Sequence, residues 1–481
     1  MEQNKSQKLE AATQSDELEA SLAFSNPLLD SEEKIREVPP LQVPLIFCLA
    51  AFSFFTTCFF FLKDKSLYWD TAQHFVQFRD NLHSVNAFGE IAYWFPHVQF
   101  GWPSYYYSIL GFPHGATPLF GLLAFVCWAL GQFGIILKAY HPIYVFYFGF
   151  LTPVTFLFAV NCFAREFLRT KEAVSFALII AAFSPGVMVN ITDIGFLEPA
   201  AYSLFFGAAF LAYFRKPGLL TFGALCLSCA LLGLACNYAF MFWNLIIIPL
   251  FVGGFVALAF WEKNDTWNVI RQTKAWKRLL CAVLMLVGFL LNLVAYRGTQ
   301  ELVKPHLDGQ AYKFEELRPG NPLAVFTASL PGFGFEWAPK YREYWSLLPR
   351  TERGVHLAYN YMGLLSVPLM ILALIYGNMR TRTALLLLLL AVFGVINLAG
   401  YSPLFAWLLA MPSPLRSVNH YSDLLFRSGG FLVILFGAAF GLETLRRRNE
   451  EGSGKFLKIF IGTTLAGLVI FILGYKDQTL R

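Results

Sequence analysis

Residues 43–62 read VPLIFCLAAFSFFTTCFFFL, and this uncharged apolar run decides the fold class. A helix of about 20 apolar residues is long enough to cross the hydrocarbon core of a bilayer. Runs of similar length recur along the chain, in which 57% of the residues are hydrophobic and only 14% are charged. A soluble domain of this composition would expose too much apolar surface. The sequence therefore predicts an all-α polytopic membrane protein, because a chain in lipid must pair its backbone polar groups within its own helices.

The distribution of Lys and Arg predicts which side of the membrane each loop faces. We expect about eleven transmembrane helices, with a re-entrant or surface-lying helical hairpin at about 104–136. The helices are expected at about 43–62, 142–163, 173–190, 198–214, 219–236, 239–260, 279–296, 359–377, 383–399, 425–445 and 456–474. With this assignment the short basic loops all fall on one side, as the positive-inside rule requires. The N-terminus is then cytoplasmic and the C-terminus external.

The same assignment divides the chain into two parts. Residues 1–42 are polar and of mixed charge, and we expect a disordered cytoplasmic tail. Residues 43–481 form a single transmembrane domain. Its two large external elements are a first loop at about 63–140, with juxtamembrane helices, and a long aromatic loop at about 297–358.

The first external loop carries the pattern that most strongly indicates function. Asp70 and His74 stand four residues apart, and so would share one face of a helix. Trp94 and the stretch GWPSYYY at 101–107 follow. An acid and an imidazole at the mouth of a membrane bundle favour polar chemistry over packing. The alternatives are a helix cap or surface ion pair for Asp70, and an interfacial position for His74.

Further charged residues are expected on the external side. Asp193 and Glu198 lie in a very short loop, where they are either acids that face a shared cavity or a solvated acid and a helix cap. A segment that is expected to be external carries positive charge at Arg416, His420 and Arg427, although the positive-inside rule would leave few basic residues there. Arginine matches the geometry of phosphate oxygens, so these three are candidates to bind a donor phosphate. The alternative is snorkelling to lipid phosphates.

Four patches of the sequence, in this order, resemble those of the GT-C class of membrane glycosyltransferases, especially its YfhO-like bacterial branch. They are Asp70 with the aromatic pattern after it, the acidic loop with Asp193 and Glu198, YMGLL at 361–365, and PSPLRSVNH at 412–420 leading through Arg427 into a helix of small residues. The resemblance extends over about residues 43–445. The first loop lacks the tandem acidic motif found in many such enzymes.

The resemblance implies an enzyme that transfers a sugar from a polyprenyl-phosphate donor to a lipid-linked glycan, lipid or protein acceptor on the external face of a bacterial inner membrane. Asp70 would be the base or would orient the acceptor, with His74, Asp193 and Glu198 as further catalytic candidates. Aromatic rings suit sugar faces, so the expected acceptor-binding residues are Trp69, Trp102, Tyr106 and Trp337. A bilayer-interface aromatic belt is the alternative for such rings.

No cofactor and no metal site are predicted. His83, His97 and His114 lie near Asp70 and leave a divalent-metal site as an alternative, but their spacings match no standard ligand pattern. All eight cysteines fall in apolar segments, which predicts small buried side chains and neither a disulfide framework nor a zinc site.

Two other functions compete with glycosyl transfer. A transporter or flippase for a lipid-linked sugar would place acids deep within the spans, whereas the clearest acids here are expected in external loops. A catalytically inactive relative that scaffolds envelope glycan assembly is the other, since the first loop has a single aspartate in place of a tandem acidic motif.

Overall fold

The computed structural model describes residues 38–64, 69–88, 94–95, 102–103, 118–133, 135, 139–183, 197–234, 273–288, 290, 365–377, 382–383, 385–389, 422–450, 457–458, 460–462 and 464–465. Residues 1–37, which make up most of the predicted tail, lie outside these residues. The described residues are mostly helical, as predicted. The exception is an antiparallel pair of two-residue strands, β1 (Trp94–Phe95) and β2 (Trp102–Pro103), in which Phe95 pairs with Trp102.

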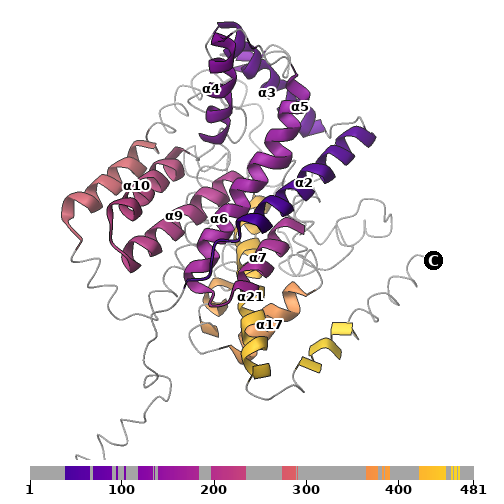
Figure 1. Ribbon diagram of the computed structural model, residues 1–481, viewed down its shortest axis with the longest axis vertical. Helices are drawn as coiled ribbons and strands as arrows, with labels where there is room; N and C mark the ends of the chain where they lie inside the picture. Colours follow the sequence, from indigo (N-terminus) through magenta and orange to yellow (C-terminus); the bar gives the residue numbers. More distant parts are fainter. Residues whose placement is uncertain are drawn as a thin grey trace, which may run out of the picture. The chain divides into compact units, whose positions relative to one another are not determined.

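The helices of the first half follow the predicted order (Figure 1). Helix α2 covers Val43–Asp64, and α3 covers Trp69–Phe88 within the predicted first external loop. Of the helical hairpin predicted at about 104–136, residues 104–117 lie outside the described residues, and the rest contains α4 (Pro118–Gln132), which packs against α3. Three further helices are α7 (Lys171–Phe183), α9 (Leu197–Arg215) and α10 (Leu219–Leu234).

Between α4 and α7 the chain forms one long helix with a wide turn inside it. It consists of α5 (Tyr140–Phe146), the π-helical turn η2 (Tyr147–Leu151) and α6 (Thr152–Phe167). Pro153 explains the wide turn: it has no backbone N–H to donate to Gly149 four residues earlier, and its ring crowds that carbonyl. Tyr140–Phe167 is the one helix among the described residues that is long and apolar enough to cross a membrane, with 28 residues.

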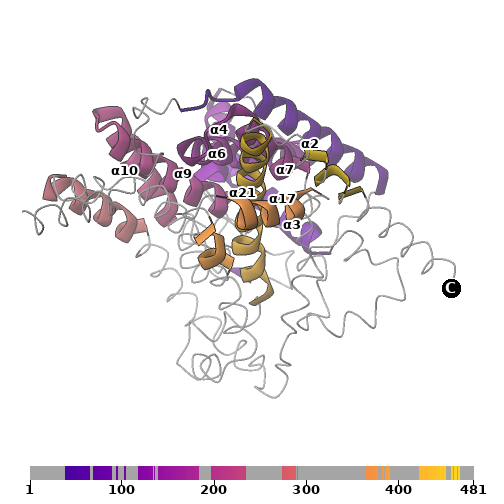
Figure 2. The same cartoon turned by 90° about the horizontal axis from the view of Figure 1, so that it is seen from below.

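The second half of the chain contributes α17 (Ser366–Tyr376), α21 (Ser422–Glu450) and an unlabelled helix at 275–288. Helices α17 and α21 lie side by side in both views (Figures 1 and 2). Glycines allow this approach: a Cβ added at Gly441 of α21 would lie 2.0 Å from the carbonyl oxygen of Leu369 in α17. Small residues at such contacts let helix backbones approach closely.

Most buried side chains belong to one cluster formed by α2, α6, α7, α9, α17 and α21. A second cluster joins α3 and α4 to α5 and η2, and a third joins α9 and α10 to the helix at 275–288. Several large apolar side chains stay exposed on the outside of these helices, among them Leu220 at 89% and Leu279 at 65%.

Candidate functional site

Glu198, in the first turn of α9, is buried inside the helix bundle with only 2% of its surface exposed. Its Oε1 accepts hydrogen bonds from the hydroxyl of Tyr147 at 2.5 Å and from Thr152 Oγ1 at 3.4 Å. Its Oε2 accepts one from the hydroxyl of Tyr202 at 3.2 Å. A buried acid needs such donors because desolvation otherwise disfavours it strongly. The alternative of a solvated loop acid is therefore wrong for Glu198. We call these four residues the hydroxyl site.

The helix geometry explains why these three hydroxyls converge. Tyr202 stands one turn after Glu198 on α9, so the two side chains share a face. Tyr147 opens the wide turn η2 and Thr152 begins α6, the neighbour of α9. A π-helical turn re-aims the side chains that it carries, and such turns are frequent at functional sites.

The hydroxyl site is linked to the helix that carries Asp70. The ring of Phe78 on α3, which is fully buried, lies 5.8 Å from the ring of Tyr147 and 5.2 Å from that of Tyr144. Asp70 and His74 stand eight and four residues before Phe78 in the same helix. Both residues are therefore helical, as predicted, on an element that packs against Tyr147.

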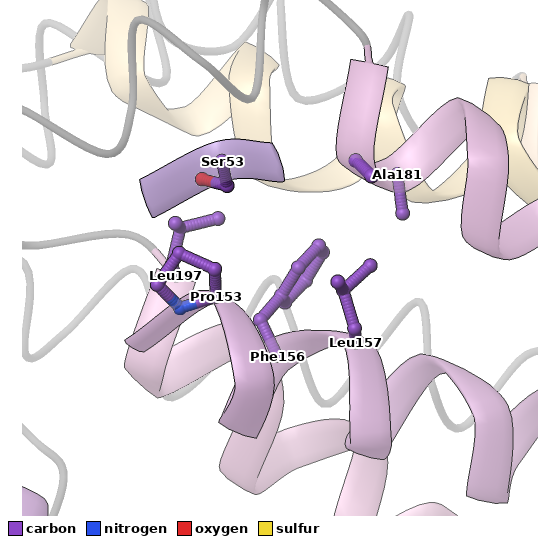
Figure 3. Close-up of a pocket in the computed structure, with 7 residues that line it drawn as sticks. Ser53, Pro153, Phe156, Leu157, Ala181 and Leu197 are labelled. Carbon is purple, nitrogen blue, oxygen red and sulfur yellow. The ribbon is translucent and has the colours of Figure 1, made fainter. Parts of the chain in front are cut away.

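A small cavity lies between α2, α6, α7 and the start of α9 (Figure 3). Its lining includes Ser53 of α2, Pro153 and Phe156 of α6, and Leu197, the neighbour of Glu198. Its volume is about 10 Å³, enough for roughly one water molecule. The Ser53 hydroxyl is the polar side-chain group of this lining, and the space is too small and too apolar for a sugar.

The opposite end of the α6–α9 pair is held by charges. Glu166 of α6 accepts a hydrogen bond from Arg215 of α9 and forms an ion pair with it. Glu443 of α21 accepts hydrogen bonds from the backbone N–H groups of Arg169 and Thr170, which precede α7. We call this end of the bundle the basic end; it also includes the contacts of Arg446 and Arg447 on α21.

Two arginines extend the basic end along α21. Arg446 donates to Glu172 at 2.7 Å and to Glu450 at 2.8 Å, and Arg447 donates to the carbonyl oxygen of Tyr376 at 3.4 Å. The hydrogen bond to Glu450 and the nearby Glu172 carboxylate raise the pKa of Arg446 above its usual value. Residues from the ends of five helices thus meet at the basic end, and they come from loops that the charge pattern predicts to be cytoplasmic.

The other predicted site residues are placed only in part. Trp69, Asp70 and His74 lie in α3, Trp102 in β2 and Arg427 in α21, but their side chains lie outside the described part of the structure. Tyr106, Asp193, Trp337, Arg416 and His420 lie outside the described residues altogether. Of the predicted site residues, Glu198 is the one whose side-chain contacts are described.

The histidines of the first loop are the candidate ligands of the alternative metal site. Nδ1 of His83 lies 3.1 Å from the hydroxyl of Tyr140, which links α3 to the start of α5. Within the described residues, no group of three His, Cys, Asp or Glu side chains is arranged to hold a metal ion. His97 and His114 lie outside those residues.

Sequence reasoning missed the partners of Glu198. Tyr202 could have been found, because a Glu and a Tyr four apart on an apolar helix are an expected pair. Tyr147 and Thr152 gave no signal, since they precede Glu198 by 51 and 46 residues.

No family model, curated protein or solved structure matches the chain. Function must therefore be inferred from the residues and their contacts.

Proposed function

We propose that this protein is a polytopic membrane glycosyltransferase. It would transfer a sugar from a polyprenyl-phosphate donor to an envelope acceptor on the external face of the membrane. Asp70 would act as the base or orient the acceptor hydroxyl, and Arg416, His420 and Arg427 would bind the donor phosphate. Glycosyl transfer needs both parts, because a carboxylate must act on the acceptor and positive charge must stabilise the departing phosphate.

The direction of the helices supports the membrane topology of this proposal. Helices α6 and α9 run parallel, since Thr152 contacts Glu198 near their starts and Glu166 contacts Arg215 near their ends. In α17 and α21, Leu369 lies beside Gly441, and Tyr376 beside Arg447. The charge pattern independently assigns each of these pairs the same direction across the membrane. The exposed apolar side chains then face lipid.

The position of Asp70 carries the catalytic part of the proposal. Asp70 is the second residue of α3, a helix of low apolar content that starts five residues after α2 ends. The following turns of α3 pack against α4 and α5 through Phe78 and Leu82, which fixes the helix on the bundle. An acid at the start of a fixed surface helix is held where a membrane-bound acceptor would arrive. Glu198 serves as a positioning residue, because it holds Tyr147, against which α3 packs.

The test uses a deletion strain in which wild type, Asp70→Asn or Asp80→Asn is expressed to equal levels. Asp80 is the matched control, because it lies on the same helix and pairs with Arg79 at 2.8 Å, away from the start of α3. Mass spectrometry of envelope glycolipids and glycoproteins should show a sugar-bearing species restored by wild type and Asp80→Asn but not by Asp70→Asn. Equal restoration by Asp70→Asn would remove the catalytic role of Asp70.

A transporter of lipid-linked sugars is the second candidate, and the burial of Glu198 favours it. Transporters bury acids within their helix bundles for coupling or substrate binding, and Glu198 is 2% exposed. Detergent-solubilised protein separates the two functions, because detergent removes the compartments. Mixed with the lipid extract of the deletion strain, an enzyme still forms the sugar-bearing product. A product that forms in sealed membranes alone would favour transport.

A further inference from the structure

Three cysteines from two separate helices meet in the third apolar cluster. Cys226 and Cys229 stand three apart on α10, and so share a helix face. Cys281, on the helix at 275–288, packs into the same apolar cluster as both. Cys229 is buried, and Cys226 and Cys281 are half-buried. The sequence predicted small buried side chains, and it gave no indication that Cys281, 52 residues beyond Cys229, would join the pair.

The two helices hold these thiols together at a fixed register. Near the start of the pair, the rings of Phe222 and Trp276 lie 5.7 Å apart. Toward the other end, a Cβ added at Gly233 would lie 2.8 Å from the carbonyl oxygen of Met285 and 3.0 Å from the Cα of Gly288. The helices therefore run parallel with their backbones in close approach, and the three thiols lie between these two contacts.

A second group of contacts fixes the same helix pair next to the cysteines. Nζ of Lys277 lies 4.9 Å from the centre of the Phe222 ring and 3.4 Å from the hydroxyl of Tyr213. Cation–π contacts of this kind restrain both helices at the level one turn before Cys281. The thiols are thus held together by packing on both sides and not by the cysteines themselves.

We propose that Cys226, Cys229 and Cys281 form a thiol–disulfide site in which Cys281 makes a reversible disulfide with one of the two α10 cysteines. The oxidant is a low-molecular-weight disulfide. One protein thiolate attacks it, forms a mixed disulfide and releases one small thiol. A second protein thiolate then displaces the other small thiol, so two protein thiols lose two protons and two electrons and the small disulfide becomes two thiols.

The third cysteine gives the site a function beyond a structural cross-link. Because Cys281 lies near both α10 thiols, the remaining free thiol can attack the disulfide and exchange its position. The described cysteines form no disulfide in this structure. Oxidation would cross-link two helices that are separated by a long stretch of chain, and would therefore restrict any movement of one helix along the other.

The test is differential labelling of the full-length protein in its membranes. In the test, diamide replaces the small disulfide as the oxidant; it is a permeant diazene that takes up two hydrogens as two protein thiols form a disulfide. Free thiols are then blocked with light N-ethylmaleimide, the protein is denatured and reduced, and the released thiols are labelled with the heavy reagent. We expect at least a tenfold rise in the heavy-to-light ratio at Cys281 and at one α10 cysteine. Cys48 on α2, which is exposed, is the control and should stay light.

Two variants decide the assignment. In Cys281→Ser the α10 cysteines should remain light after oxidation, and in a Cys226→Ser, Cys229→Ser double variant Cys281 should remain light. Because these variants use different helices, a folding defect in one leaves the other informative. A light Cys281 in the oxidised wild type, heavy α10 cysteines in Cys281→Ser, or a cross-link between two copies of the chain would each overturn the proposal.

Discussion

The α6–α9 helix pair carries a carboxyl group at each end, and the two groups are held in different ways. At the hydroxyl site, Glu198 is buried and accepts hydrogen bonds from neutral hydroxyls of Tyr147, Thr152 and Tyr202. At the basic end, Glu166 pairs with Arg215, whose side chain is 37% exposed. Water can replace part of the second interaction but none of the first. The two ends therefore differ in what their loss would cost.

A third carboxyl group is intermediate between these two. Glu443 is half-buried and accepts hydrogen bonds from backbone N–H groups just before α7, where the helix dipole also favours negative charge. The molecule thus contains three carboxyl groups with different donors: hydroxyls for Glu198, backbone N–H groups for Glu443 and a guanidinium for Glu166. If burial and donor type decide the stabilisation, the series should rank Glu198, Glu443 and Glu166 in that order.

Removing the carboxyl group of Glu198 should have the largest effect. Glu198→Ala leaves three buried hydroxyls without their acceptor and opens a cavity, at a cost of about 3 kcal/mol or more. Glu198→Gln keeps one acceptor oxygen and the volume, and should cost about 1 kcal/mol. Thermal unfolding of the purified full-length protein in detergent measures both.

The control for Glu198 is Glu450→Ala at the far end of α21. The Glu450 side chain is 62% exposed, so its removal should leave the unfolding temperature unchanged. An unfolding temperature of Glu198→Ala that equals that of wild type would mean that the hydroxyl site contributes nothing to stability. The positioning role given to Glu198 would then fail as well.

Glu443→Ala should have the second largest effect, at about 1–2 kcal/mol, because backbone N–H groups at the start of a helix lose their acceptor. Amide hydrogen exchange provides the specific measurement: protection of the first turn of α7 should fall, while that of α10 stays the same. Glu443→Gln is the matched control, because it keeps an acceptor oxygen. It should lower the free energy of unfolding by less than half as much as Glu443→Ala does. Equal losses in both variants would show that the charge, and not the capping, holds α7.

Local patterns in the sequence predict where several of the described helices begin and which of them run parallel. The uncharged runs place the starts of α2, α9 and α10 within a residue of those observed, because an apolar run bounded by charge or Pro and Gly fixes a helix locally. The basic loops predict which helices run parallel, because charge assigns a side to every loop. Contacts of α6 with α9 and of α17 with α21 agree with that assignment.

Contacts between distant segments could not be predicted in this way. Glu198 looks like a loop acid in the sequence, because its donors Tyr147 and Thr152 come from another helix. Cys226 and Cys229 look like packing residues in the sequence, because Cys281, which packs into the same cluster, belongs to the helix at 275–288. Such sites depend on how helix faces meet, and a single sequence carries only the periodicity of each face.

The ion pair between Arg215 and Glu166 should have the smallest effect of the series. A double-mutant cycle with Arg215→Gln and Glu166→Gln should give a coupling energy below about 1 kcal/mol, because water competes for the exposed guanidinium. Salt should weaken this coupling further, since mobile ions screen exposed charges. The cost of Glu198→Ala should change less with salt, because its described partners Tyr147, Thr152 and Tyr202 are neutral and buried. Two results would contradict this ranking: a coupling energy of Arg215 and Glu166 that exceeds the cost of Glu198→Ala, or one that does not fall with salt. Burial would then not decide which end contributes more to stability, and the basic end would hold the α6–α9 pair more strongly.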